Sequence, residues 1–301
     1  MDNPFTSFSL WAGLFGGLAL FLFGMDVMTH ALKSAAGDYI KDILARMTRN
    51  RFVGVGMGAF VTAIIQSSSV TTVIMVGFIS AGLMTMSQSV AVIIGANIGT
   101  TITAQILAFK VTKLALPLIA AGFLVSFTAK SEHWRQGGSI VLGLGLIFFG
   151  MAIMSDALYP LRSYPPFIDF MVSMNSVLLA AAMGAAFTAI VQSSSATTGI
   201  LIVLASQGLI ALETAIAIAM GANIGTCVTA LLASIGKPRE AKSAALVHTI
   251  FNVSGVLIWI AFIPQLAAFA QWVSPSAEGL AGMDRLAAET PRQIANVHTF
   301  F

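Results

Sequence analysis

The sequence predicts an all-α integral membrane protein that is built from two repeats of inverted topology. Hydrophobic residues make up 57% of the chain and charged residues 9%, with a mean hydropathy of +0.90, whereas a soluble domain carries about 25% charged residues. Apolar runs recur at about the 20 residues that a membrane-spanning helix needs. They are too continuous for the alternating strands of about 10 residues in a membrane barrel, so helices are expected throughout.

An internal duplication predicts the two repeats. Residues 66–72 read Gln-Ser-Ser-Ser-Val-Thr-Thr, and residues 192–198, which lie 126 positions later, read Gln-Ser-Ser-Ser-Ala-Thr-Thr. The sequence Gly-Ala-Asn-Ile-Gly-Thr recurs at the same offset. Between residues 57–104 and 183–230, 25 of 48 aligned positions are identical without a gap, which indicates two copies of one structural unit.

Repeat 1, at residues 11–130, should begin with a membrane span at residues 11–32. The serine-rich motif then sits in the middle of residues 52–80, between apolar arms of roughly 12–14 residues that are each too short to cross a bilayer. A re-entrant helical hairpin that turns at this polar tip fits better than a straight span, because irregular backbone at such depth must line a cavity or be buried in protein. Spans are expected at residues 89–109, where Gly-Ala-Asn-Ile-Gly-Thr should break the helix, and at residues 114–128.

Repeat 2, at residues 136–263, should follow the same pattern. A second re-entrant hairpin is expected at residues 177–206, and the spans are expected at residues 138–158, 214–234 (the second broken helix) and 243–263. The remaining stretch, residues 264–301, should form a loop and the start of a further, truncated helix, because His298-Thr299-Phe300-Phe301 echoes His248-Thr249-Ile250-Phe251.

The charges of the loops predict the orientation of the repeats. Each repeat is expected to cross the membrane three times, which is an odd number, so the second copy should lie upside down relative to the first. The loops on one side, at residues 33–51, 130–135 and 237–242, then hold ten Lys and Arg residues and the other side holds five, although Lys110 and Lys113 run against this trend. The more basic side is expected to face the cytoplasm, which predicts a multi-pass protein of the plasma (inner) membrane.

Several other classes of protein are excluded by composition. The net charge of +3 comes from loops and does not indicate a nucleic-acid surface. The single cysteine, Cys227, excludes an intrachain disulfide and a multi-cysteine metal site. The sequence has no nucleophile elbow, no phosphate-binding loop and no metal-spaced His cluster, so an enzyme is not expected.

The two serine-rich tips are the candidate binding site. Inverted repeats with broken helices are typical of secondary transporters, in which the substrate binds near the bilayer midplane where the repeats meet. The tips offer hydroxyl and amide groups that both donate and accept hydrogen bonds, and the start of each second arm exposes backbone N–H groups that favour an anion. The same oxygen atoms suit small hard cations, so the chemistry fits an oxyanion together with alkali cations.

Charge balance favours sodium as the cation. No Lys or Arg lies inside the predicted hairpins or broken spans, so a doubly charged anion would need accompanying cations to reach the midplane. Neutral oxygen ligands suit Na⁺, whereas a proton would need a carboxylate or a histidine. Asp26, in the first span, is open to two interpretations, a coupling residue or a hydrated residue near the membrane surface. His248 fits a hydrogen-bonded helix contact better than a ligand.

A purely structural interpretation of the polar residues is the alternative. Ser and Thr can simply join membrane helices, and glycines can simply allow close packing, but two serine motifs at one offset argue against that interpretation of the tips. A buried Asn97 or Asn223 would need polar partners. Four threonines lie at helical spacing on the same faces and could complete cation shells: Thr100, Thr103, Thr226 and Thr229.

At these residues the sequence resembles the type II sodium-dependent phosphate cotransporter family, including its bacterial members. The match rests on the doubled motif at residues 66–72 and 192–198, on residues 95–101 and 221–227, and on residues 248–252, and it covers roughly residues 14–263. The resemblance implies inverted repeats with re-entrant hairpins and a Na⁺-coupled symport of inorganic phosphate by alternating access.

The resemblance also implies roles for individual residues. Ser68, Ser69, Ser194 and Ser195 look like phosphate donors, and Gln192, Ser193, Thr226 and Thr229 look like sodium ligands. With the residue chemistry above, the predicted phosphate site comprises Gln66, Ser67, Ser68, Ser69, Thr71, Ser194, Ser195, Thr197, Asn97 and Asn223, and the predicted sodium sites comprise Gln192, Ser193, Thr100, Thr103, Thr226 and Thr229. Electrogenic animal relatives have an aspartate where this sequence reads Lys110-Val111-Thr112-Lys113-Leu114, so the ion stoichiometry stays open.

The sequence is therefore interpreted as a secondary active transporter, a sodium-coupled phosphate symporter. Its expected partners are inorganic phosphate, Na⁺ and membrane lipid, with no cofactor other than Na⁺ as the coupling ion, and a homo-oligomer is left open. The alternatives are a cation-coupled transporter of another oxyanion and a membrane scaffold or sensor that transports nothing.

Overall fold

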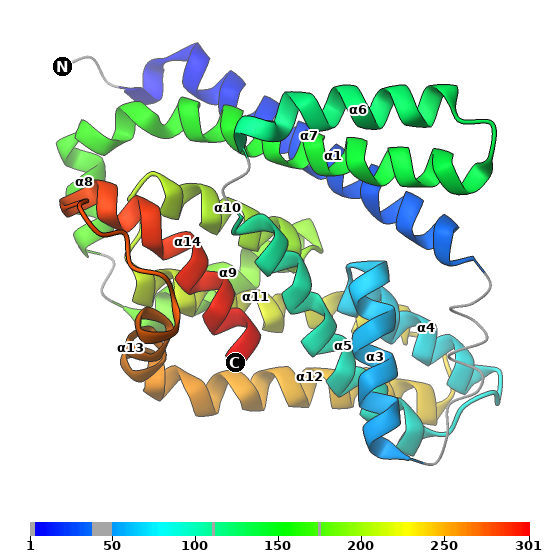
Figure 1. Cartoon of the computed structure of the whole chain (residues 1–301). Helices are drawn as coiled ribbons and strands as arrows, with labels where there is room; N and C mark the ends of the chain where they lie inside the picture. The colour runs from blue at the N-terminus through cyan, green and yellow to red at the C-terminus, as the bar shows by residue number, and fades with distance from the viewer. Residues whose placement is uncertain (1–3, 38–49, 110–111, 174–175) are drawn as a thin grey trace.

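The described part of the chain consists of helices joined by turns and loops. The computed structural model describes residues 4–37, 50–109, 112–173 and 176–301, and all regular secondary structure in these residues is α-helix or short 3₁₀-helix (Figure 1). Within them, five helical segments are long and apolar enough to cross a membrane: Phe8–Ala36, Met86–Leu107, Glu132–Ser163, Leu212–Ala233 and Arg239–Val273. The prediction of an all-α membrane protein is confirmed.

The duplication is visible in the helix boundaries. Three helices of the first half, α3 (Arg51–Ile65), α4 (Ser68–Ser80) and α5 (Met86–Leu107), recur 126 residues later with identical lengths. Their equivalents are α9 (Val177–Val191), α10 (Ser194–Ser206) and α11 (Leu212–Ala233). In each copy the first two helices are arms of 15 and 13 residues joined by two residues. The predicted hairpins are therefore formed.

The equivalent helices α1 (Phe8–Ala36) and α7 (Glu132–Leu158) pack against each other in opposite directions. A Cβ atom on Gly17 would lie 2.8 Å from the carbonyl oxygen of Gly150, and one on Gly24 would lie 2.8 Å from that of Gly143. Gly143 and Gly150 are the residues 126 positions after Gly17 and Gly24, so each contact is matched by its mirror contact. The α1–α7 contact is thus unchanged when the two helices are exchanged.

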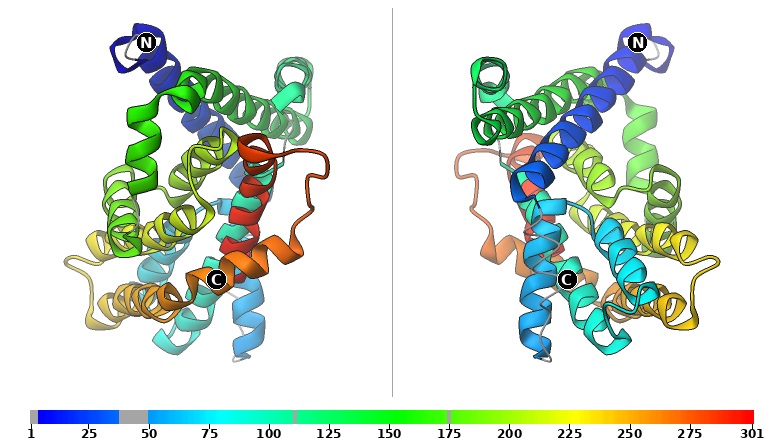
Figure 2. Two further views of the ribbon diagram at one scale, coloured as in Figure 1. Left: turned by 90° about the vertical axis from the view of Figure 1, so that its left-hand side faces the viewer. Right: turned by 90° about the vertical axis from the view of Figure 1, so that its right-hand side faces the viewer.

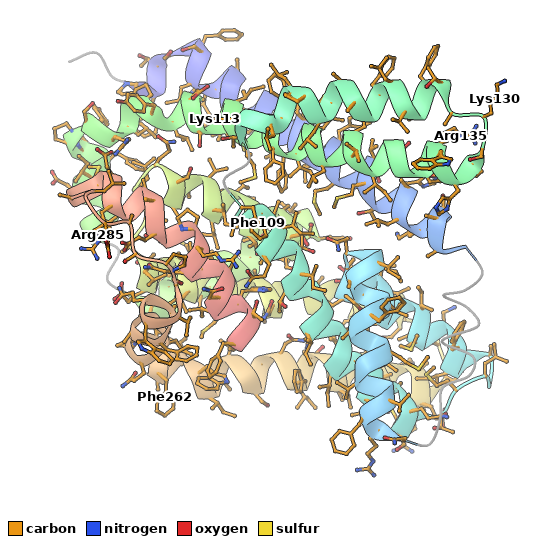
Figure 3. The ribbon with its side chains drawn as sticks, viewed as in Figure 1. Phe109, Lys113, Lys130, Arg135, Phe262 and Arg285 are labelled. Carbon is orange, nitrogen blue, oxygen red and sulfur yellow. The ribbon has the colours of Figure 1, made fainter. Side chains whose placement is uncertain are left out.

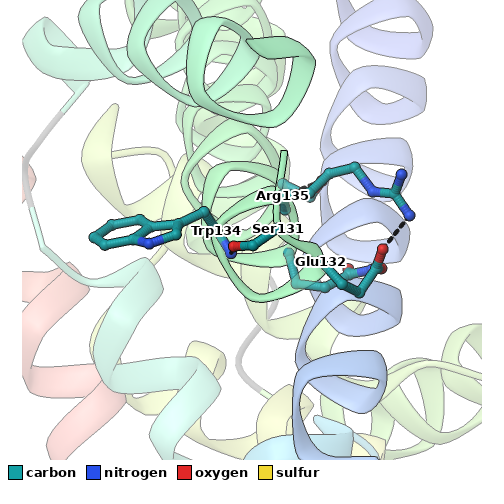
Figure 4. A network of polar contacts seen from close by, with 6 residues as sticks. Ser131, Glu132, Trp134 and Arg135 are labelled. Atoms are coloured by element: carbon teal, nitrogen blue, oxygen red, sulfur yellow. Dashed lines mark hydrogen bonds and ion pairs between the residues drawn. The ribbon is translucent and has the colours of Figure 1, made fainter. Parts of the chain in front are cut away.

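The remaining first-half helix, α6 (Ala115–Thr128), lies alongside α7. Together α1, α6 and α7 form a layer above the hairpin helices in Figures 1 and 2. The α6 helix has 14 residues, fewer than the roughly 20 that a straight membrane span needs. At the start of α7, the hydroxyl of Ser131 accepts a hydrogen bond from Trp134 N at 3.4 Å, and Arg135 pairs with Glu132 at the surface (Figure 4).

The predicted helix break at Gly-Ala-Asn-Ile-Gly-Thr is wrong. Both α5 and α11 run through this sequence without interruption. The glycines instead let the first arm of each hairpin approach closely, because a Cβ on Gly95 would lie 2.0 Å from Val55 O and one on Gly221 would lie 1.9 Å from Ala181 O. For the glycines, the packing interpretation is the correct one.

The C-terminal stretch holds two helices instead of a loop and the start of one helix. The first is α13 (Ile263–Val273), and the second is α14 (Gly282–Phe300). Asp284 near the start of α14 pairs with Arg162 at 2.8 Å. The loop before α14 is fixed to the helix by Glu289, which accepts hydrogen bonds from Ala277 N at 2.8 Å and from Arg285 at 2.9 Å. These donors hold the pKa of the Glu289 carboxyl below its usual range.

Helices α12 (Arg239–Trp259) and α14 occupy corresponding places in the two halves. The α12 helix packs against α4, α5 and α11, and α14 packs against α10, α11 and α5, which is the same set with the repeats exchanged. Residues 245–251 and 295–301 agree at five of seven positions. The echo at the end of the sequence thus marks a helix that packs on the second hairpin as α12 packs on the first. Two short elements lie between α7 and α9, the 3₁₀-helix Tyr159–Ser163 and α8 (Pro165–Ser173).

The charge pattern remains a prediction. Most of the basic stretch at residues 33–51, and Lys110, lie outside the described residues.

Candidate functional site

The two tips have the same unusual backbone. Gln66 and Gln192 adopt φ values of 60° and 58°, and among the described residues they alone have a positive φ without being glycine. A long side chain in this region costs about 1–3 kcal/mol, and such strain concentrates at functional sites. The left-handed residue ends the first arm and lets the second arm begin two positions later.

The first serine of each motif starts the second arm. Ser67 caps α4 by accepting a hydrogen bond from Val70 N at 3.3 Å, and Ser193 caps α10 by accepting one from Ala196 N at 3.1 Å. The other backbone N–H groups in the first turn of each arm, those of the second and third serines of the motif, have no intrahelical partner. These donors and the positive end of the helix dipole favour an anion at each tip.

A buried pair of threonines holds the arms of each hairpin together. The Thr62 and Thr71 hydroxyl oxygens lie 2.8 Å apart, and the Thr188 and Thr197 oxygens lie 2.6 Å apart. The predicted ligands Thr71 and Thr197 are thus engaged in closing the hairpins. Thr62 and Thr188 were not predicted, although they are identical in the aligned copies and lie four residues before each glutamine, a signal that could have revealed them.

The second and third serines of each motif lie in the protein interior, and one of them connects the two repeats. Ser68, Ser69, Ser194 and Ser195 are all buried. The Ser69 hydroxyl donates to the backbone carbonyl of Thr226 at 3.2 Å, which joins the hairpin of repeat 1 to α11 of repeat 2. The contacts are also reciprocal, since α4 packs on α11 and α10 packs on α5. The structure therefore brings predicted phosphate and sodium residues of opposite repeats together.

Equivalent residues of the two copies differ in their contacts. In repeat 1, Thr103 donates a hydrogen bond of 2.6 Å to the side-chain carbonyl of Gln66, which is 5% exposed. In repeat 2, Gln192 is exposed, and the Thr229 hydroxyl is buried with no hydrogen-bond partner in the part of the chain that the structure describes. The glutamine–threonine hydrogen bond is thus present in repeat 1 and missing from the equivalent residues of repeat 2.

Two further predicted cation ligands, Thr100 and Thr226, donate their hydroxyl protons to backbone carbonyl oxygens. Thr100 donates its hydroxyl proton to Ala96 O at 3.0 Å, and Thr226 donates to Ala222 O at 2.8 Å. Each oxygen can still accept or coordinate. Asn97 and its equivalent Asn223 are both partly buried, and the side-chain nitrogen of Asn97 is buried without a partner among the described residues.

The site is almost free of formal charge. The hairpin helices and α5 and α11 contain Arg51 and Glu213 as their charged residues, both in the first turn of a helix. Within the described residues, no group of three or more His, Cys, Asp or Glu side chains could hold a metal ion. Asp26 is exposed on α1, and His248 is fully buried with both ring nitrogens unpartnered in the described structure.

Comparison with known proteins gives a consistent result. A family model described as Na⁺/Pi-cotransporter matches residues 20–156 and 170–281. The protein YqeW of Bacillus subtilis, whose function is uncharacterized, is 34% identical over 86% of this chain and 84% of its own length. A protein of Escherichia coli K12 that is provisionally named an inorganic phosphate export protein, YjbB, is 28% identical over 84% of this chain.

A vertebrate relative also matches. The rat sodium-dependent phosphate transport protein 2A is 25% identical over 82% of this chain and 60% of its own length. The match to the Escherichia coli protein covers 47% of that protein, so this chain spans about half of its length. No solved structure matches the chain.

Proposed function

The chain belongs to the Na⁺/Pi-cotransporter family, and on that basis we propose that it carries inorganic phosphate across the plasma (inner) membrane by sodium-coupled symport. The single observation that carries this proposal is the contact between the repeats at Ser69 and Thr226. It joins a serine of one tip to the helix that holds the predicted sodium ligands of the other copy. Phosphate would bind at the two helix N-termini, next to these serines.

The neutral character of the site supports coupling to a cation. Phosphate that enters a site without basic side chains would gain its charge balance from ions that travel with it. Hydroxyl oxygens that have already donated their protons, such as those of Thr100 and Thr226, are suitable ligands for Na⁺. The proposal requires no cofactor other than Na⁺ as the coupling ion.

The pairing of α1 with α7 supports inverted repeats and alternating access. Equivalent helices that pack in opposite directions would be related by an axis in the membrane plane if they span the bilayer. The difference between the Gln66–Thr103 and Gln192–Thr229 pairs supports two half-sites that exchange their open and closed states.

Uptake of labelled phosphate into proteoliposomes tests this proposal. We expect uptake to require an inward sodium gradient and to be lost when choline replaces sodium. Uptake that ignores sodium but increases with an acid exterior would reassign the coupling ion to H⁺, with Asp26 as the first residue to mutate. An absence of phosphate movement in both directions would overturn the proposal.

The direction of net transport is part of the same experiment. One relative is named for phosphate export and another for sodium-dependent transport. Vesicles loaded with labelled phosphate and diluted into sodium-containing or sodium-free buffer measure efflux. Efflux that is accelerated by outward sodium gradients and slowed by inward ones is the result expected of a symporter.

A further inference from the structure

Helix α14 places a basic residue beside the helices of the candidate site. Figure 2 shows α14, in red, next to α5, in teal. The side-chain nitrogen of Gln105, on α5, donates to Ala295 O at 3.1 Å and to the Asn296 side-chain oxygen at 3.2 Å. These bonds fix α14 against the C-terminal end of α5, one turn away from Arg292.

Arg292 lacks the partners that the neighbouring arginines have. Its guanidinium carbon lies 4.9 Å from the ring centroid of Phe109, and one terminal nitrogen is buried without a hydrogen-bond partner among the described residues. Arg285, on the same helix, pairs with Glu289 at 2.9 Å, and Arg162 pairs with Asp284 at 2.8 Å. In the described part of the chain no carboxylate forms an ion pair with Arg292.

Two cavities lie at the Arg292–Phe109 contact, one lined by each of the two residues. Phe109, which is labelled in Figure 3, lines a cavity of about 290 Å³ together with the hydroxyl-bearing residues Thr112, Ser155 and Ser206. Arg292 lines a neighbouring cavity of about 520 Å³ with Gln105 and Asn296. The planar fork of a guanidinium matches an oxyanion better than any other cation in proteins does. Polar groups that could complete such a site are therefore present on both sides.

We propose that Arg292 is an oxyanion-binding residue at one mouth of the transport path, where it holds a phosphate group before or after its passage through the central site. This inference rests on the proposed function. The cavity that Phe109 lines also reaches Ser206 at the C-terminal end of α10. Since α10 has 13 residues and starts at Ser194, this mouth is roughly 20 Å along α10 from the tip of repeat 2. A cation there concentrates anions without placing a positive charge among the sodium ligands.

Asp156 provides a test of whether Arg292 serves a phosphate ion or a carboxylate of the protein. Its exposed carboxylate lines the same 290 Å³ cavity as Phe109. A carboxylate there would repel a phosphate ion, so the proposal predicts that Asp156→Asn leaves transport unchanged or lowers the phosphate concentration needed. If Arg292 instead serves only as an ion-pair partner of Asp156, Asp156→Asn and Arg292→Gln should lower the melting temperature by similar amounts.

The test compares Arg292→Gln with the matched control Arg285→Gln in sealed vesicles of known orientation. Loss of one charge-assisted contact should raise the phosphate concentration for half-maximal transport by about tenfold, from the α14 side only and without change in the maximal rate. Arg292→Lys keeps the positive charge but lacks the two parallel N–H donors of the guanidinium. Its phosphate concentration for half-maximal transport should lie between those of the wild type and Arg292→Gln. A merely structural role would change both sides and the melting temperature.

The lipid composition distinguishes free phosphate from a lipid headgroup as the ligand. If free phosphate binds, the effect of Arg292→Gln persists in neutral phosphatidylcholine vesicles. If the ligand is the headgroup of an anionic lipid, the effect appears only with phosphatidylglycerol. Wild-type transport combined with an unchanged concentration dependence of Arg292→Gln in both lipids would overturn this inference, while loss of wild-type transport would overturn the proposed function itself.

Discussion

The contrast between Thr103 and Thr229 gives a matched pair of substitutions. Thr103→Val removes the hydroxyl that donates to Gln66 at 2.6 Å and leaves a buried glutamine oxygen without a partner. Such a loss costs about 1–3 kcal/mol. Thr229→Val, the same change 126 residues later, removes a buried hydroxyl that has no partner among the described residues, so it should leave stability unchanged or raise it slightly.

Two measurements separate the effects. In detergent without sodium, Thr103→Val should lower the melting temperature by about 2–8 °C, whereas Thr229→Val should not lower it. In transport, Thr229→Val should raise the sodium concentration for half-maximal uptake. If the contact of Na⁺ with a hydroxyl contributes as much as a hydrogen bond to a charged group, about 1.5–3 kcal/mol, the increase is about tenfold or more.

Either of two results would refute this reasoning. Equal losses of melting temperature in the two variants would show that the copies do not differ in solution. An unchanged sodium dependence in Thr229→Val would remove this residue from the sodium site, whatever its effect on stability.

Two further predictions concern the tips and the helix packing. Ser68→Ala and Ser194→Ala should each abolish phosphate transport while expression and melting temperature stay as in the wild type, and wild-type transport rates in both would remove the serines from the site. Gly95→Ala and Gly221→Ala should destabilise the protein by about 1–3 kcal/mol, since the added carbon would meet a carbonyl oxygen at 2.0 or 1.9 Å, whereas Gly56→Ala, which meets nothing within 4 Å, should not lower the melting temperature.

The hairpins could be predicted from the sequence because two independent constraints agree. Each apolar arm is too short to cross the bilayer, and the duplication fixes the same polar turn in both copies. The helix boundaries recur at the predicted offset of 126 residues. The threonine pairs that close the hairpins escaped prediction, because a contact between residues on opposite arms depends on how the arms face each other.

The errors at Gly-Ala-Asn-Ile-Gly-Thr and at α14 have a physical origin. A glycine allows both a helix break and a close approach of two helices, and only the position of the neighbouring arm decides between them. The α14 sequence contains Asp284, Arg285, Glu289, Pro291 and Arg292, a composition that is typical of a loop in a membrane protein. Its helical form depends on burial of one apolar face against α10 and α11, which composition does not reveal.

The difference between the two copies could not be predicted from residues that are identical in both. Gln66 and Gln192 share the same backbone conformation, and Thr103 and Thr229 lie at the same place on equivalent helices. The glycine contacts between α1 and α7 are symmetric, whereas the contacts at the two tips are not. If the protein works by alternating access as we propose, exchange of the two states would break the Gln66–Thr103 bond and form the Gln192–Thr229 bond. The loss and gain of equivalent hydrogen bonds would keep the two states close in free energy, and binding of phosphate and sodium could then decide between them.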